Sequence, residues 1–173
     1  MKKLFQSILI ITLLIFSTIA PSDKNSQKAI AVLYPTFMND VHGTVTFTKV
    51  DEGVLVTGKV SGLTSGNHGF HIHQWGDCSS TDGKSAGGHF NPESKSHGGP
   101  DNIDRHIGDL GNIEADESGI AHINFIDKML TFEGPNSIVG RAVIIHEKSD
   151  DLTSQPTGAA GTRVACGVIG IAR

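Results

Sequence analysis

Two histidines one residue apart are the first residues in this chain whose arrangement suits chemistry. His71 and His73 occur in "GFHIHQWGDC", residues 69–78, which predicts a β-strand followed by a turn. Side chains two positions apart on a strand leave the same face, about 6–7 Å apart. Imidazole nitrogens suit copper and zinc. The pair is therefore compatible with a metal site, although two solvent-exposed histidines on a strand would have the same spacing.

Further candidate ligands follow in the sequence. They occur in "GGHFNP", "SHGGP", "RHIGDLG" and "VIIHEK", and are His89, His97, His106, Asp109 and His146. Together with the strand pair they make six histidines and one aspartate, more than one tetrahedral site holds. The sequence therefore predicts two metals, or one metal with spare residues. The carboxylate is compatible with zinc.

Short strands separated by glycine-rich turns are expected to position these residues. The strand-like stretches are 41–50, 54–60, 67–75, 119–127, 137–148 and 162–172. No ten-residue helical pattern follows residue 20. The chain has 173 residues, 21 of them glycine, which is enough for one domain with many turns. These features predict an all-β sandwich or barrel.

The segment 76–111 has few strand signals and many glycine and polar residues. A structureless segment of this length is unusual inside a compact domain, so it needs another source of order. Bound metal is one such source. A disulfide is another: in an exported protein, the two cysteines Cys78 and Cys166 are expected to pair. Two free buried thiols are the alternative.

Residues 1–20 are predicted to be a signal peptide. Lys2 and Lys3 precede an apolar run over residues 8–16, and small residues follow up to Ala20. The run is too short to span a bilayer. We therefore expect cleavage after Ala20 and export to the periplasm or the extracellular space. A retained membrane anchor is the alternative.

The rest of the chain is predicted to be a tether over residues 21–36 and one domain over residues 37–173. The formal net charge of the chain is −4, and loss of the signal peptide would remove two lysines. No basic stripe is present, so binding to nucleic acid is not expected. Without the signal peptide, membrane binding is not expected either.

Six stretches carry a resemblance to a known family. They are "GFHIH", "GGHFNP", "HGGP", "RHIGDLGNI", "GRAVIIHEKSDDL" and "GAAGTRVACGVIGIA", from Gly69 to the C-terminus. In these stretches the chain resembles the copper/zinc superoxide dismutases, and the strands from Val41 onward fit the same family. The resemblance implies a Greek-key, eight-stranded β-sandwich or barrel with a long metal-binding loop.

The resemblance also implies which residues bind each metal. The copper ligands would be His71, His73, His89 and His146. The zinc ligands would be His89, His97, His106 and Asp109. His89 belongs to both sets and would bridge the two metals as an imidazolate.

Other matched residues have implied roles outside the metal ligands. Asp150 would link the two metal sites by accepting hydrogen bonds from two of the histidines, His71 and His97. Cys78 and Cys166 match the disulfide of the family. Arg163 matches the arginine at the mouth of the copper channel.

The implied activity is dismutation of two superoxide radicals to dioxygen and hydrogen peroxide. Copper would alternate between two oxidation states, and zinc would be structural. His89 would deliver a proton, and Arg163 would attract and orient the superoxide anion. The family forms homodimers, so a homodimer is expected here.

Two departures from the family pattern matter. Cys78 follows His73 by five residues, as in secreted bacterial members, whereas "HEKSDDL" and "GVIGIA" resemble the eukaryotic members. The two groups dimerise through different faces, and "GVIGIA" favours the eukaryotic one. In addition, the segment 151–163 is shorter than the matching eukaryotic loop, so electrostatic steering of the substrate is expected to be weaker or rearranged.

Three alternative functions fit parts of the sequence. A non-enzymatic copper carrier or chaperone would keep a similar domain, but it usually loses copper ligands or the arginine. A secreted structural β-sandwich would keep zinc without copper chemistry. A copper-only dismutase is disfavoured because His97, His106 and Asp109 are all present.

The three histidines outside these sets are expected to have other roles. His68 matches a position in the family that bonds to nearby backbone. His42 and His122 lie on predicted strands without a ligand partner in the sequence, so both are expected to face solvent.

Overall fold

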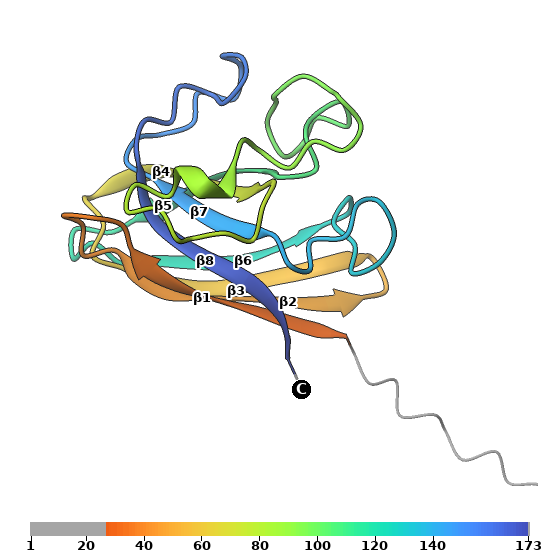
Figure 1. Cartoon of the computed structure of the whole chain (residues 1–173), viewed down its shortest axis with the longest axis horizontal. Helices are drawn as coiled ribbons and strands as arrows, with labels where there is room; N and C mark the ends of the chain where they lie inside the picture. The colour runs from red at the N-terminus through yellow and green to blue at the C-terminus, as the bar shows by residue number, and fades with distance from the viewer. Residues whose placement is uncertain (1–26, 173) are drawn as a thin grey trace, which may run out of the picture.

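Strands account for nearly all the regular structure in the computed structural model, which describes residues 27–172 (Figure 1). They are β1 (Lys28–Pro35), β2 (His42–Val50), β3 (Gly53–Ser61), β4 (Gly66–His73), β5 (Asp109–Ala115), β6 (Ala121–Asp127), β7 (Ala142–His146) and β8 (Arg163–Ala172). Within the described residues the strands close into an antiparallel barrel in the order β1-β2-β3-β6-β5-β4-β7-β8. The predicted all-β barrel is therefore confirmed.

The alternation of buried and exposed side chains explains how the strands form the barrel. On β2, Val45 and Phe47 are fully buried, whereas Thr46 between them is partly exposed. On β3, Val54 and Val56 are likewise buried, with the partly exposed Leu55 between them. This strand pairs with β2 along its whole length. Period-two alternation places one face of each strand in the core. The strand predicted over residues 41–50 is confirmed.

Two strands were not predicted. The tether predicted over residues 21–36 is wrong from Lys28 to Pro35, where β1 pairs with both β2 and β8. The folded domain therefore includes residues from Lys28 onward, not from residue 37. On β1, Ala29 and Ala31 point inward, but the outward Ile30 and Val32 are apolar too, and this hides the alternation.

Strand β5 begins within the last three residues of the segment 76–111, in which few strand signals were found. Its first residue is Asp109, a buried carboxylate, and it contains Gly111 and Asn112. Aspartate, glycine and asparagine are depleted in strands, so local propensity argues against this one. Pairing with β4 stabilises it nonetheless.

The predicted signal peptide, residues 1–20, lies outside the described residues.

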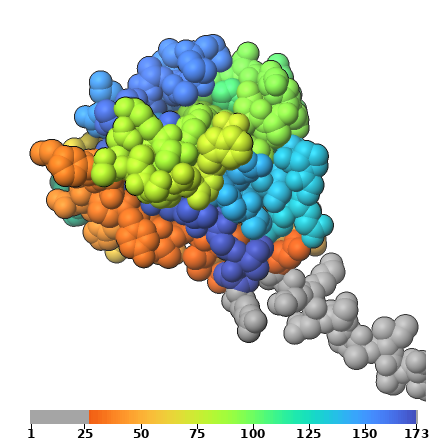
Figure 2. Space-filling view, viewed as in Figure 1, coloured from red at the N-terminus to blue at the C-terminus, as the bar shows by residue number. Residues whose placement is uncertain are grey.

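The long segment 76–108 contains no strand and one short 3-10 turn, η1 (Lys84–Ala86). A disulfide between Cys78 and Cys166 ties its beginning to β8, which confirms the predicted pairing. This segment and the segment 149–162 rise from the same side of the barrel (Figure 1). Figure 2 shows both packed over that side. Among the described residues, no helix is long and apolar enough to cross a membrane.

Candidate metal centre

Two clusters of possible metal ligands lie side by side where the segment 76–108 covers the barrel. The first group is His71, His73, His89 and His146, and the second group is His89, His97, His106 and Asp109. Within each group one ligand atom of every residue lies within 4.8 Å of the others, and all members are buried. His89 belongs to both groups. The structure thus brings together all seven residues that the sequence singled out.

Strands β4 and β7 position three members of the first group. His71 and His73 leave the same face of β4, with their ring centroids 6.4 Å apart. His146 ends the neighbouring strand β7, and its Nε2 lies 3.3 Å from His73 Nε2. His89 joins them through an isolated bridge between its backbone and that of His73. The spacing expected from strand geometry is therefore observed.

Each histidine of the first group that lies on a strand has one ring nitrogen in contact with a carboxylate or carbonyl oxygen of the protein. His71 Nε2 lies 2.7 Å from Asp150 Oδ2. His73 Nδ1 lies 3.0 Å from the Gly87 carbonyl oxygen, and His146 Nδ1 lies 3.2 Å from that of Gly161. The opposite nitrogen of each ring therefore points into the cluster.

Buried nitrogens without partners test whether this group fits a metal. Within the described residues, His71 Nδ1 and His89 Nε2 are buried and have no hydrogen-bond partner. An unpaired buried polar atom is costly and needs an explanation. Four imidazole nitrogens facing one point are a donor set that suits copper. The residues of the first group therefore fit a copper ion.

The second group converges on one carboxylate oxygen. Asp109 Oδ1 lies 2.7, 3.0 and 3.1 Å from the Nδ1 atoms of His89, His97 and His106 respectively. Its other oxygen, Oδ2, accepts hydrogen bonds from the backbone N–H groups of Gly98 and His106. Three imidazole nitrogens and one carboxylate oxygen are a closed four-ligand set of the kind that zinc prefers.

Asp150 connects the two groups. Its Oδ2 lies 2.7 Å from His71 Nε2, and its Oδ1 lies 3.0 Å from His97 Nε2. The amide of Asn112 holds the backbone of Asp150, because it accepts from the Asp150 N–H and donates to the Asp150 carbonyl. Such partners set the ring orientation of a metal-binding histidine. The contacts predicted for Asp150 are observed.

The two groups differ in how their histidines titrate. Burial lowers the pKa of His89 to about 4 and that of His146 to about 3. Burial acts on His97 in the same direction, but the hydrogen bonds of Asp109 and Asp150 outweigh it and raise its pKa to about 9. Metal binding requires neutral imidazole. His89 and His146 therefore present neutral nitrogens to the first group at neutral pH.

Arg163, at the start of β8, is anchored by the segment 76–108. Its two terminal guanidinium nitrogens each donate to a carbonyl oxygen at 2.6 Å, one of Gly83 and one of Gly87. Gly87 O also contacts His73 Nδ1, so the arginine and the first group share a backbone anchor. Burial lowers the pKa of Arg163. An arginine nonetheless stays charged at neutral pH.

Two residues near the site were not singled out from the sequence. Asn112 lies in "GDLGNI" and gave no signal beyond that of a turn former. Arg105 is almost fully buried, pairs with Asp127 on β6, and donates to the carbonyls of His106 and Ile107. A buried arginine cannot be told from an exposed one by its neighbours in sequence.

The three remaining histidines lie where they were expected. His68 is buried, and its ring nitrogens contact the carbonyl oxygens of Thr64 and His146. His42 and His122 are exposed. All three lie outside both groups.

Comparison with known proteins agrees with this geometry. Residues 41–169 match the family described as copper/zinc superoxide dismutase. A Xenopus laevis protein named superoxide dismutase (Cu-Zn) A is 52% identical over 151 residues, which are 83% of this chain and 97% of that protein. A crystal structure of the clock protein EA4 has a TM-score of 0.78 at 46% identity, covering 85% of this chain and 96% of its own. The chain therefore belongs to the copper/zinc superoxide dismutase family.

Proposed function

We propose that this protein converts two superoxide radicals and two protons into one dioxygen and one hydrogen peroxide. The observation that carries this proposal is the shared histidine: His89 joins two buried ligand groups, one suited to copper and one to zinc. Copper would be held by His71, His73, His89 and His146, and zinc by His89, His97, His106 and Asp109. When bound, copper supplies reversible one-electron chemistry, and zinc supplies fixed charge without redox chemistry.

His89 is the residue that we assign to proton delivery. Its Nδ1 contacts Asp109 Oδ1, which orients the ring, and its Nε2 faces the first group without a hydrogen-bond partner among the described residues. Nε2 can therefore take up a proton in one half of the cycle and give it to the nascent peroxide in the other.

Arg163 is the residue that we assign to substrate attraction. Superoxide is a small anion, and a guanidinium offers it charge and several N–H donors. The hydrogen bonds to Gly83 and Gly87 keep this side chain in one orientation near the first group. Because Arg163 is half-buried, its field is less screened by water than that of an exposed lysine.

Superoxide decay tests the activity directly. The mature protein would be reconstituted with one copper and one zinc per chain and compared with a zinc-only sample. Fast decay that depends on copper is the expected result. If zinc binds and the fold is ordered but copper adds no activity, the enzyme proposal fails, and a binding or structural role takes its place.

Replacing Arg163 with glutamine tests its role. The rate of superoxide consumption is expected to fall by about tenfold and to depend less on ionic strength, since one charge–anion attraction is lost. Lys84→Gln is the matched control, because it removes a neighbouring positive charge that is exposed and paired with Asp82. Equal rates for Arg163→Gln and the unmodified protein at every ionic strength would contradict the assignment.

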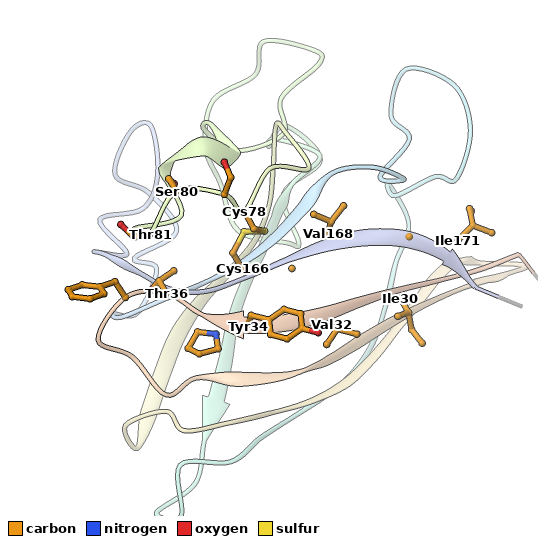
Figure 3. Close-up of a pocket in the computed structure, with 15 residues that line it drawn as sticks. Ile30, Val32, Tyr34, Thr36, Cys78, Ser80, Thr81, Cys166, Val168 and Ile171 are labelled. Carbon is orange, nitrogen blue, oxygen red and sulfur yellow. A yellow bond between two sulfur atoms is a disulfide. The ribbon is translucent and has the colours of Figure 1, made fainter.

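A homodimer through β1 and β8 is part of the proposal. Support comes from a groove of about 720 Å³ over the outer face of these strands, with the disulfide among its lining residues (Figure 3). Ile30 and Val32 line it from β1, and Val168 and Ile171 line it from β8. Val168 and Ile171 are 42% and 66% exposed. Exposed apolar patches of this kind mark protein–protein contacts.

Sedimentation of single-residue variants tests this dimer face. The unmodified protein is expected to sediment as a dimer, and Val168→Asp as a monomer, because an aspartate would be desolvated in the contact. Ile126→Asp on β6 is a matched control, since Ile126 is 45% exposed and lies away from the groove. A Val168→Asp variant that stays dimeric would contradict this face, and a monomeric unmodified protein would contradict the dimer.

Export, to the periplasm or to the extracellular space, is the remaining part of the proposal. The disulfide between Cys78 and Cys166 supports it, because disulfides persist in oxidising compartments. Removal of a signal peptide over residues 1–20 predicts secreted protein that begins at Pro21. Mass spectrometry of secreted material that still begins at Met1 would contradict cleavage.

A further inference from the structure

The segment 151–158, which follows Asp150, contacts the second group through the backbone of His97. No ligand residue makes this contact. The side-chain amide of Gln155 pairs with both backbone groups of His97: Oε1 accepts from the His97 N–H at 2.8 Å, and Nε2 donates to the His97 carbonyl at 2.9 Å. The two residues are 58 positions apart. This pairing imitates one rung of a β-ladder, made by a side chain instead of a strand.

The segment 151–158 is braced internally, so Gln155 is presented from a fixed turn. The Asp151 N–H donates to the Gly158 carbonyl at 2.9 Å, and the Gly158 N–H donates to the Ser154 carbonyl at 2.7 Å. The Asp151 carboxylate accepts from the backbone N–H groups of Thr153 and Ser154. A short, self-bonded turn loses little entropy when its side chain makes a contact.

The same segment also packs closely against the hydrogen bond between Asp150 and His97. A Cβ added to Gly158 would lie 1.7 Å from Asp150 Oδ1 and 2.7 Å from His97 Nε2. Gly158 has a φ of +63°, in the left-handed region that favours glycine. The turn therefore contacts His97 twice, through its backbone at Gly158 and through the Gln155 amide.

His97 depends on such contacts because it lies outside any strand. Its neighbour Gly98 is held by Asp109 Oδ2, and His106 is held by the same oxygen. The His97 backbone has no such bond to Asp109: its N–H donates to Gln155, and its carbonyl accepts from Gln155. Its ring must point Nδ1 at Asp109 and Nε2 at Asp150 at the same time. A small rotation of the His97 backbone would break one of these contacts.

We propose that Gln155 is a positioning residue for zinc binding, which it serves by fixing the backbone of His97. This inference rests on the proposed function, since it requires the second group to bind zinc. Gln155 does not touch the metal site itself. Its amide offers one acceptor and one donor in one plane, which a carboxylate or a hydroxyl of similar length cannot do.

Zinc release from the copper- and zinc-loaded protein tests the proposal. Transfer of zinc to an excess of a chromogenic chelator at neutral pH is expected to be about tenfold faster for Gln155→Ala, at the low end of the effects of residues that orient metal ligands. Gln155→Glu keeps the acceptor but loses the donor, so its rate of zinc release should lie between those of the unmodified protein and Gln155→Ala. Thr153→Ala is the matched control, because it removes side-chain hydrogen bonds of the same turn without touching His97.

A second readout separates positioning from general loosening. With cobalt(II) in place of zinc, the visible absorption bands report ligand geometry, and they are expected to shift in Gln155→Ala but not in Thr153→Ala. Hydrogen exchange of β1, β2 and β3 in the loaded protein should be the same in all variants. Release rates and cobalt spectra of Gln155→Ala equal to those of the unmodified protein would overturn the proposal.

The outcomes also distinguish this proposal from the proposed function. If the unmodified protein retains no zinc in the second group, the proposed function fails first. If it retains zinc and catalyses superoxide decay while Gln155→Ala releases zinc at the unmodified rate, the role of Gln155 alone fails. Equal acceleration in Thr153→Ala and Gln155→Ala would assign the effect to the turn as a whole and would also overturn the proposal.

Discussion

The two ligand groups share His89 but are positioned by different kinds of structure. In the first group, three of the four histidines lie on paired strands: His71 and His73 on β4 and His146 on β7. In the second group, His97 and His106 lie in the segment 76–108, and their common contact is Asp109, the first residue of β5. The barrel thus preforms one site, whereas the other depends on contacts between loops.

The electrostatic environments differ in the same way. Burial dominates at three histidines of the first group: it lowers the pKa values of His73, His89 and His146 and keeps these rings neutral. In the second group, the carboxylates of Asp109 and Asp150 raise the pKa of His97 and hold a proton on its ring. A rigid apolar scaffold and a carboxylate-rich loop are thus two routes to a metal site.

The largest expected effect is on activity and comes from the first group. His146→Ala removes one nitrogen of the copper set, and superoxide consumption should fall on the order of a thousandfold or more, as when a member of a catalytic unit is removed. Zinc content should not change, because His146 lies outside the second group. His122→Ala, at an exposed histidine on β6, is the control. Loss of zinc in His146→Ala would contradict the independence of the two groups.

The next effect is on order in the segment 76–108. Asp109→Ala removes the oxygen shared by three histidines, so zinc should be lost, and amide hydrogen exchange in residues 76–108 should rise. Exchange in β4 and β7 should change little, because the barrel positions these strands. Asp104→Ala, at an exposed aspartate of the same segment, should have no effect. Equal loosening of the barrel strands in Asp109→Ala would show that the two regions fold as one unit.

The disulfide should stabilise the beginning of the same segment independently of the zinc ligands. Replacing both Cys78 and Cys166 with serine should lower the free energy of unfolding by about 2–4 kcal/mol, since the cross-link closes a long loop. Denaturant unfolding measures this loss, with Ser79→Ala as the control for a change in the exposed loop surface. Zinc content should be retained. Unfolding at the same denaturant concentration before and after the change would contradict a stabilising role.

The smallest effect is a difference in proton release. His97 has a raised pKa of about 9, so in the metal-free protein its ring is protonated at pH 7, and zinc binding must displace that proton. His89 and His146 have lowered pKa values, so their rings are neutral at pH 7 and carry no extra proton for copper to displace when each metal is added alone; the imidazolate form of His89 requires both metals. Zinc should therefore release about one proton more than copper. Titration calorimetry at pH 7 in buffers of different ionisation enthalpy measures this, and equal release for both metals would contradict the contrast.

The comparison also shows where prediction from sequence was effective. The spacing of His71 and His73 on one strand face follows from local strand geometry, and their ring centroids lie 6.4 Å apart in the structure. The inward face of β2 follows from the same period-two pattern. Strand β1 was missed because Ile30 and Val32 are apolar on its outer face, and β5 was missed because Asp109 and Asn112 argue against a strand. In both strands, pairing with neighbours outweighs local pattern.

The sequence alone determined the types of the ligand residues, the strand that carries two of them, and the family to which the chain belongs. The tertiary structure decided which ring nitrogen of each histidine stays free, which carboxylate oxygen of Asp150 faces each group, and that Gln155 holds the backbone of His97. These contacts join residues 53 to 79 positions apart. They exist because the closed barrel brings the segments 76–108 and 149–162 to the same side, and no local pattern in the sequence encodes that approach.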